Sequence, residues 1–179
     1  CALWDLEAKR AGKRVWEMAG LTPPGSVTTA FTLGLATPEK MGASAKRHAD
    51  KPLLKLKVTG EGDFERVAAV REGAPNARLI VDANEGWTAE VVEPLSYELK
   101  TLGVEMIEQP LPAAKDAVLA DLSHPVPLCA DESCHTSADL AQLKGRYEVV
   151  NIKLDKTGGF TEALKLKQEA HDMGFRVMV

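Results

Sequence analysis

The sequence predicts an α/β protein, a (β/α)8 TIM-type barrel of which the chain covers about strands one to seven. Short apolar or β-branched runs alternate with amphipathic segments of helical periodicity, a pattern typical of βαβ units and a parallel sheet. Five successive predicted strands also present a charged residue near their carboxyl ends, at intervals of 22 to 27 residues. Because such barrels carry their active site at the carboxyl ends of the strands, this regular spacing favours a barrel over an open sheet.

The predicted elements follow an N-terminal lead-in. Seven runs are predicted to be strands, at 27–35, 53–58, 78–83, 104–107, 126–130, 149–154 and 175–179. Six segments are predicted to be helices, at 38–48, 64–72, 88–102, 114–122, 137–143 and 161–173. Residues 2 to 20 are helical in character with breaks at Gly12 and Gly20, and residues 21–26 form a connector. A complete barrel takes about 250 residues, so we expect the 179-residue sequence to be a portion of a longer protein.

The composition is that of an ordinary globular protein, with 45% hydrophobic residues, 27% charged residues and a formal net charge of −4. A mildly acidic chain with 5% aromatic residues lacks the basic and stacking surfaces that nucleic-acid binding requires. No apolar run has the length of a membrane span, and no signal peptide is visible. The three cysteines fit neither a disulfide framework nor a zinc site, so we expect a cytoplasmic protein with reduced thiols.

The stretch from Leu53 to Val58 is predicted to be a short buried strand that carries two lysines. Residues two apart on a strand point to the same face, so Lys55 and Lys57 face one side and the leucines the other. If the apolar side packs under helices, the lysines point into the barrel. Two like charges side by side in a partly desolvated place raise the free energy of the folded protein. Loss of a proton from one lysine would remove the repulsion and leave a neutral amine that can act as a base. The alternative for an isolated Lys-x-Lys is an edge strand with one solvated face.

Three acidic residues, Asp82, Glu108 and Asp131, end adjacent predicted strands and are expected to converge on one point of the barrel. Carboxylates that close repel one another and raise each other's pKa values unless a cation lies among them. Oxygen ligands without histidine or cysteine favour a hard ion, and three carboxylates leave positions on Mg²⁺ for water and substrate. Any one of these acids could be a helix N-cap or a surface residue, but the three together predict a metal site.

Two lysines lie on either side of the predicted cation in barrel order, Lys57 on the second strand and Lys153 on the sixth. A metal that holds a substrate carboxylate stabilises the enolate left when the adjacent carbon loses its proton. Lysines on opposite walls can remove a proton from one face and return one to the other, as in a two-base racemase or epimerase. Lys55 would keep the pKa of Lys57 low from the same strand face. The alternative for Lys153 is a surface lysine.

At these residues the chain resembles the enolase superfamily, its muconate-lactonizing subgroup, and most closely the dipeptide epimerases of the L-Ala-D/L-Glu type. The resembling motifs are Lys55-Leu56-Lys57, Val81-Asp82-Ala83-Asn84, Ile107-Glu108-Gln109-Pro110, Ala130-Asp131-Glu132-Ser133 and Asn151-Ile152-Lys153 with Gly158-Gly159. The resemblance implies an isomerase with Mg²⁺ on Asp82, Glu108 and Asp131. It also implies that Lys57 and Lys153 are the acid/base catalysts, with Lys55 in a supporting role and Asn84 supporting the metal ligands.

The resemblance further implies parts that the chain lacks. Members of the superfamily have an N-terminal α+β capping domain that closes over the substrate, and an eighth strand near which dipeptide epimerases hold the substrate's ammonium group. Residues 1–26 are therefore expected to be a helical lead-in and connector from a missing capping domain, and residues 27–179 a partial catalytic barrel. The implied substrate is a small-molecule carboxylate, a dipeptide by overall likeness. Because superfamily barrels often pair, a homo-oligomer is implied as well.

Other functions share these residues. Muconate cycloisomerases, N-acylamino acid racemases and o-succinylbenzoate synthases use the same kind of site, and the lysines and carboxylates do not separate them. A Schiff-base aldolase using Lys153 leaves three carboxylates unexplained. A non-catalytic scaffold has no physical need of five inward-facing charges, each of which lowers stability. Two smaller features are given structural roles: Trp87 is predicted to pack a helix on the barrel, and Gly158-Gly159 to let the backbone approach Lys153.

Overall fold

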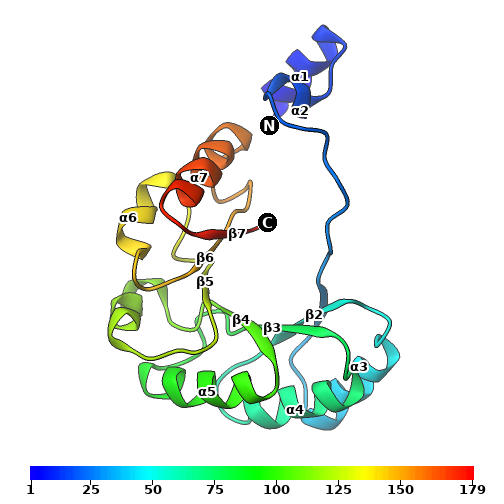
Figure 1. Cartoon of the computed structure of the whole chain (residues 1–179), viewed down its shortest axis with the longest axis vertical. Helices are drawn as coiled ribbons and strands as arrows, with labels where there is room; N and C mark the ends of the chain where they lie inside the picture. The colour runs from blue at the N-terminus through cyan, green and yellow to red at the C-terminus, as the bar shows by residue number, and fades with distance from the viewer.

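The computed structural model describes residues 1–179, in which seven parallel strands form one sheet flanked by helices (Figure 1). The strands are β1 (Phe31–Leu33), β2 (Leu53–Lys57), β3 (Arg78–Asp82), β4 (Val104–Glu108), β5 (Leu128–Ala130), β6 (Val149–Asn151) and β7 (Arg176–Met178). They lie side by side in sequence order, and the sheet curls with its helices on the outer side (Figure 1). The sheet is open between β7 and β1. This arrangement confirms the predicted α/β fold and partial (β/α)8 barrel.

The helices that alternate with the strands also match the predicted order. They are α3 (Pro38–Arg47), α4 (Asp63–Gly73), α5 (Ala89–Thr101), the 3-10 helices η1 (Ala113–Asp121) and η2 (Ser137–Asp139), α6 (Leu140–Leu143) and α7 (Phe160–Asp172). The segment predicted at 137–143 therefore begins as a 3-10 helix. Its tight first turn is closed by Asp139, whose Oδ2 accepts hydrogen bonds from the backbone N–H groups of His135 and Thr136.

Most strands are shorter than their apolar runs predicted, because backbone pairing ends before the run does. Phe31 is the first residue of β1 with a partner, Leu54 on β2, and residues 27–30 are unpaired. At β6, Asn151 pairs with Met178, the last residue of β7. The chain then turns, so that Lys153 follows the strand instead of lying within it.

The two faces of the sheet differ in a way that positions the charged residues. On the outer face, Leu54 and Leu56 are fully buried and belong to the main core formed with the helices. On the inner face, a small apolar layer lies across four strands and contains Ile80, Met106, Cys129 and Val149. Strand pairing places the β2 lysines on this inner face, because Lys55 is level with Ile80. The prediction that the lysines point into the barrel is thus confirmed.

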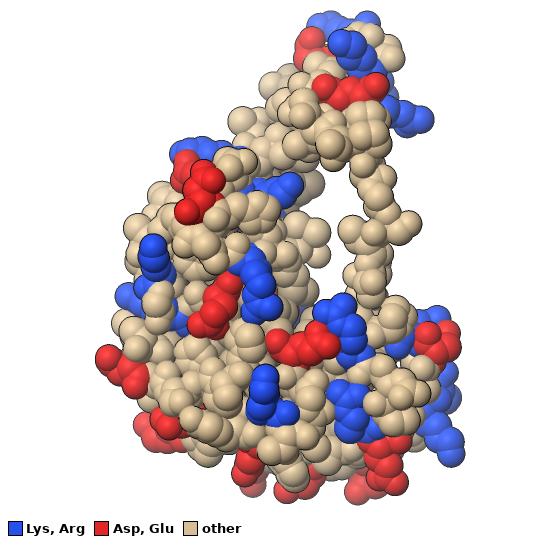
Figure 2. All heavy atoms as spheres, viewed as in Figure 1, with Lys and Arg blue, Asp and Glu red and all other residues tan.

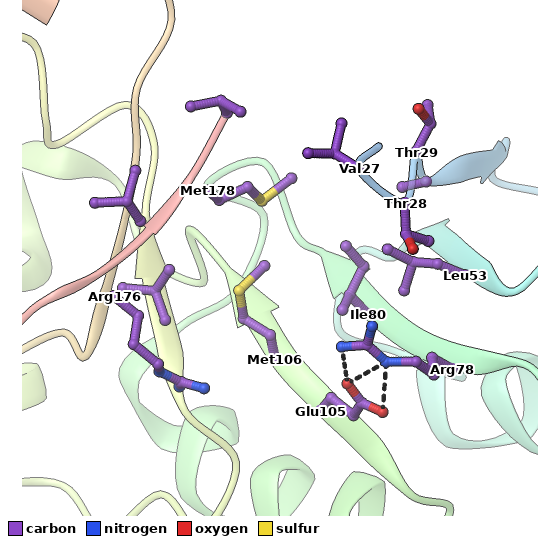
Figure 3. A pocket seen from close by; sticks show the side chains of 14 residues that line it. Val27, Thr28, Thr29, Leu53, Arg78, Ile80, Glu105, Met106, Arg176 and Met178 are labelled. Carbon is purple, nitrogen blue, oxygen red and sulfur yellow. Dashed lines mark hydrogen bonds and ion pairs between the residues drawn. The ribbon is translucent and has the colours of Figure 1, made fainter. Parts of the chain in front are cut away.

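The apolar layer borders a hollow on the inner side of the sheet, near the amino ends of the strands (Figure 3). Ile80, Met106 and Met178 line it, and Val27 faces them from the N-terminal segment (Figure 3). An ion pair between Arg78 Nη2 and Glu105 Oε2, 2.7 Å apart, lies at its edge. The inner face of the sheet is therefore apolar near the amino ends of the strands and charged near their carboxyl ends.

The N-terminal lead-in consists of two short helices, α1 (Ala2–Ala11) and α2 (Val15–Met18), followed by an extended segment that runs to β1 (Figure 1). Gly12 ends α1 in a left-handed conformation with φ 62°. Trp4 on α1 stacks edge-on against Phe160 with ring centroids 5.4 Å apart, and its Nε1 donates to Oγ1 of Thr161 at 2.9 Å. The lead-in thus packs on the first turn of α7.

On the face seen in Figure 2, acidic and basic side chains are interspersed over the outer surface. None of the helices combines the length and the apolar character that a transmembrane span requires.

Candidate active site

The predicted site residues lie at the carboxyl ends of five neighbouring strands. Lys57 ends β2, Asp82 ends β3 and Glu108 ends β4, and strand pairing sets these three residues level with one another. Asp131 directly follows β5, and Lys153 lies two residues beyond β6. The five strands therefore bring the predicted charges to one edge of the sheet, where the active site of a (β/α)8 barrel lies.

Lys55 lies two residues before Lys57 on β2 and belongs to the same cluster. Together with Lys57, Asp82, Glu108, Asp131 and Lys153 it forms a charged layer. Its Nζ lies 2.9 Å from Oδ2 of Asp82 and 2.6 Å from Oε2 of Glu108, and its side chain is 13% exposed. Burial lowers the pKa of Lys55, but attraction by Asp82 and Glu108 outweighs burial and the pKa lies above its usual range. Of the two lysines, one of which was expected to lose its proton, Lys55 therefore keeps its charge, because two carboxylates hold it in place.

Lys57 lies next to Lys55 and shares a carboxylate with it. Its Nζ lies 2.7 Å from the same Oδ2 of Asp82, and it also donates to Oδ1 of Asn84. Asn84 in turn donates from Nδ2 to Oε1 of Glu132 at 3.2 Å, and its backbone N–H donates to Oδ1 of Asp82 at 3.0 Å. Asn84 adopts a left-handed backbone conformation with φ 43°, which asparagine tolerates better than most residues. Asn84 thus links Lys57, Asp82 and the loop that follows β5.

Glu108 is fully buried at the end of β4. Its Oε1 accepts a hydrogen bond from Nδ2 of Asn151 at 2.9 Å. Burial and the nearby charge of Asp82 raise the pKa of Glu108, although Lys55 and Asn151 oppose the rise. A carboxylate in this position gains from any additional cation nearby.

Asp131 is held by two lysines, one of which the sequence analysis missed. Lys153 Nζ lies 2.5 Å from Oδ2 of Asp131, and Lys156 Nζ lies 2.6 Å from Oδ1. Burial raises the pKa of Asp131, but hydrogen bonds from Lys153 and Lys156 outweigh it and the pKa lies below its usual range. For Lys153, burial is likewise outweighed by Asp131, so its pKa is raised. The sequence offered only the position of Lys156 three residues after Lys153, in the turn that follows β6.

Gln109 is a second residue that the sequence analysis missed. It is fully buried with φ 35°, and its Oε1 accepts hydrogen bonds from the backbone N–H groups of Asp131 at 2.9 Å and Ser133 at 3.2 Å. Its Nε2 donates to Oγ of Ser133 at 2.8 Å and to the hydroxyl of Tyr147 at 3.1 Å. Gln109 therefore fixes the loop that carries Asp131. Its place beside Glu108 in the Ile-Glu-Gln-Pro motif was the only signal in the sequence.

Gly159, in the glycine pair after β6, lies close to the N-terminal lead-in. A Cβ added at Gly158 would meet no atom within 4 Å, and one at Gly159 would lie 3.3 Å from the backbone nitrogen of Cys1. The close approach at Gly159 is therefore to the N-terminal lead-in, and an approach of the glycine pair to Lys153 stays a prediction. Trp87 is buried as predicted, and its Nε1 donates to Oδ2 of Asp63 at the start of α4 at 2.9 Å.

The three carboxylates fit a metal ion in their chemistry more than in their present spacing. No three histidine, cysteine or acidic side chains lie close enough together to hold one, because the lysine ammonium groups separate the three acids. The donor set nevertheless suits Mg²⁺, since it consists of buried oxygen atoms on adjacent strands. Oδ1 of Asn151 and Oε2 of Glu132 are buried beside these acids without a hydrogen-bond partner. Such unsatisfied acceptors are rare in proteins, and each could accept a bond from a further donor or contact a cation.

Comparison with known families and proteins agrees with the resemblance seen in the sequence motifs. The sequence profile of the enolase C-terminal domain-like family matches residues 40–179. The chain is 51% identical to the L-Ala-D/L-Glu epimerase of Escherichia coli K12 and 46% identical to the N-acetyl-D-glutamate racemase of a Pseudoalteromonas species. Each alignment covers 100% of this chain and 56% of the relative. The chain thus spans little more than half the length of these relatives.

Solved structures give close matches in three dimensions. One is an enolase family member from Agrobacterium tumefaciens with homology to dipeptide epimerases, with bound sodium and L-Ala-L-Glu. It is 52% identical with a TM-score of 0.96, over 100% of this chain and 55% of that one. Another is a dipeptide epimerase from Cytophaga hutchinsonii in complex with Mg and D-Ala-L-Val, 30% identical with a TM-score of 0.93, over 98% of this chain and 50% of that one.

Proposed function

Because this chain belongs to the enolase C-terminal domain-like family, we propose that the whole protein is a Mg²⁺-dependent epimerase of dipeptides of the L-Ala-D/L-Glu type. The observation that carries the proposal is the position of two lysines at opposite ends of a row of carboxylates. Lys57 bonds to Asp82 at one end of the row, and Lys153 bonds to Asp131 at the other. Glu108 lies on the strand between them. A substrate carbon above the middle of the row would have one amine on each side.

Asp82, Glu108 and Asp131 are the proposed ligands of the metal. Bound there, Mg²⁺ would supply a Lewis acid that draws electron density from the substrate carboxylate and makes the adjacent C–H bond more acidic. Lys55 supports the site by lying between Asp82 and Glu108 as a fixed positive charge. Asn84 holds the Lys57 ammonium and the backbone after Asp82 in place.

The reaction itself is a proton exchange across the substrate carbon. A neutral lysine on one face accepts the α-proton, and the electron pair of the broken C–H bond moves toward the substrate carboxylate. The protonated lysine on the other face donates a proton to the carbon, and the pair returns to form the new C–H bond. Inversion results, and reversal of the two roles runs the reaction backwards.

Deuterium uptake followed by NMR tests this proposal. The full-length protein is incubated with Mg²⁺ in D2O with L-Ala-L-Xaa dipeptides and with N-acyl amino acids. We expect exchange at the α-carbon of the carboxy-terminal residue of L-Ala-L-Glu, with the epimer appearing alongside. Absence of exchange from every compound in the panel would overturn the proposal.

A second candidate function is racemisation of N-acyl amino acids, and one observation favours it. A relative that is 46% identical is an N-acetyl-D-glutamate racemase, and the same lysines and carboxylates would serve both reactions. An N-acyl amino acid presents the same carboxylate and α-carbon as a dipeptide, but it lacks the free ammonium group. Exchange with N-acetylglutamate and none with L-Ala-L-Glu would replace the first candidate with the second.

Three coarser features complete the proposal. Residues 27–179 would form the catalytic part, a partial barrel, and residues 1–26 a helical lead-in and connector from a capping domain. A cytoplasmic location is supported by three cysteines that are all unpaired, two of them buried. A homo-oligomer is proposed from the resemblance to superfamily barrels, and size-exclusion chromatography with light scattering would test it.

A further inference from the structure

Lys156 is a buried lysine next to the proposed site that the reaction above does not use. Its side chain is 12% exposed, and its Nζ makes three contacts of hydrogen-bond length. It donates to Oδ1 of Asp131 at 2.6 Å, to the backbone carbonyl oxygen of Asp131 at 2.6 Å and to the backbone carbonyl oxygen of Asn151 at 2.8 Å. Two of these three acceptors are main-chain oxygens, whereas Lys55 contacts only carboxylates.

These contacts use the whole hydrogen-bonding capacity of the group. An ammonium group has three N–H donors, and each of the three from Lys156 has its own acceptor. Lys153 differs, because it is 43% exposed and its Nζ donates one hydrogen bond, to Oδ2 of Asp131. Lys153 is therefore free to turn toward a substrate, whereas Lys156 is fixed.

The contacts of Lys156 also determine how Asp131 is held. One carboxylate oxygen and the main-chain oxygen of Asp131 bond to the same ammonium group, so rotation of the side chain would break a charge-assisted hydrogen bond. The third bond reaches Asn151, the last residue of β6, two residues before Lys153. Lys156 thus joins the end of β5 to the end of β6 and sets the separation of Asp131 from Lys153.

We propose that Lys156 is a positioning residue that orients the carboxylate of Asp131 for the metal and fixes it relative to Lys153. The inference rests on the proposed function, because it assigns Asp131 to Mg²⁺. Residues that orient metal ligands typically contribute about 10- to 100-fold in metal affinity. An amine whose three donors are all taken up by Asp131 and Asn151 suits this task, because it holds the ligand and has no donor left for the substrate.

Mg²⁺ titration of the full-length protein tests the proposal, with a thermal shift as readout. The variants are Lys156→Met, which keeps the length of the side chain and removes its charge, and Lys156→Arg, which keeps charge and donors. Lys167→Met on the exposed face of α7 is the matched control. We expect the Mg²⁺ Kd to rise about 10- to 100-fold in Lys156→Met, to recover in part in Lys156→Arg, and to stay unchanged in the control.

Kinetics separate positioning from a purely structural role. Lys156→Met should lower kcat for epimerisation, and saturating Mg²⁺ should restore only part of it. The inference would be overturned by a Lys156→Met variant that has a native circular dichroism spectrum and a lower melting temperature but keeps the wild-type Mg²⁺ Kd. If Lys156→Met does not fold, Lys156→Gln gives the same comparison with one donor group retained.

The two proposals fail in different ways. If the wild-type protein binds no Mg²⁺, both the proposed function and this inference are overturned. If the wild-type protein binds Mg²⁺ and epimerises a dipeptide but Lys156→Met has the same Kd, only the inference is overturned.

Discussion

Lys55 lies with its ammonium nitrogen 2.6 Å from Oε2 of Glu108, a carboxylate that is fully buried. This pair joins β2 to β4 across the inner face of β3, and its lysine also lies 2.9 Å from Asp82. The charged layer is therefore a mutually compensated set, in which each buried acid has a lysine within reach. Removal of Lys55 leaves Glu108 without its lysine partner, and the consequence can be measured.

Lys55→Met should strongly destabilise the protein in the absence of added Mg²⁺. Loss of one partner of a buried ion pair typically costs about 3–5 kcal/mol, because the other charge remains buried. Urea unfolding followed by circular dichroism measures the change. The double variant Lys55→Met with Glu108→Gln is the control, and it should recover part of the loss since both charges are gone. Equal instability of the single and double variants would contradict the pairing.

Asp82→Asn should remove most of the stabilisation that Mg²⁺ gives to the full-length protein. A ligand at one hundred times its Kd stabilises the folded state by about 2.7 kcal/mol, and a neutral amide is a poorer Mg²⁺ ligand than a carboxylate. Thermal unfolding with and without Mg²⁺ measures the gain. Asp121→Asn, at an exposed position, should keep the full response. An Asp82→Asn variant that keeps it too would show that the metal binds elsewhere.

Asp139 should contribute stability that depends on pH. Burial raises the pKa of Asp139, but hydrogen bonds from the backbone of Thr136 and His135 outweigh burial and the pKa is lowered in the folded state. A lowered folded pKa means that the contribution is present above the unfolded pKa, about 3.9, and is lost as pH falls through the folded pKa. Asp139→Ala should cost about 1 kcal/mol at pH 7 and less at pH 3. Thermal melts at the two pH values test this, and an equal loss at both would refute it.

Trp4→Ala should loosen the N-terminal lead-in from α7. The variant loses the edge-on stack on Phe160 and the hydrogen bond to Thr161. Such an aromatic pair contributes about 0.5–1.5 kcal/mol beyond its buried area. Faster amide hydrogen exchange is expected in α1 and the first turn of α7, with little change in β2 to β4. Leu3→Ala, whose side chain is 76% exposed, serves as the control.

The order and type of the elements could be predicted from the sequence, because apolar periodicity reports burial directly. Leu54 and Leu56 alternate with Lys55 and Lys57, and the structure buries the former against helices and turns the latter inward. Strand ends were less predictable. β1 is shorter than its apolar run because pairing with β2, and not hydrophobicity, sets its first residue.

The candidate site, like the fold, could be predicted only in part from the sequence. Residues that end predicted strands, such as Asp82 and Glu108, could be placed because the barrel brings strand ends together. Lys156 and Gln109 could not, because their roles depend on long-range bonds to Asp131. The charge state of Lys55 also depends on which acids surround it, and spacing along the chain does not give that information.

The most direct test of the two-base assignment is deuterium exchange by the Lys153→Ala variant of the full-length protein. Both enantiomers of the carboxy-terminal residue, L-Ala-L-Glu and L-Ala-D-Glu, are incubated separately with Mg²⁺ in D2O. If Lys57 and Lys153 each serve one face, epimerisation should stop while one of the two dipeptides still exchanges its α-proton. Loss of exchange from both dipeptides, or its retention in both, would contradict the assignment of one lysine to each face.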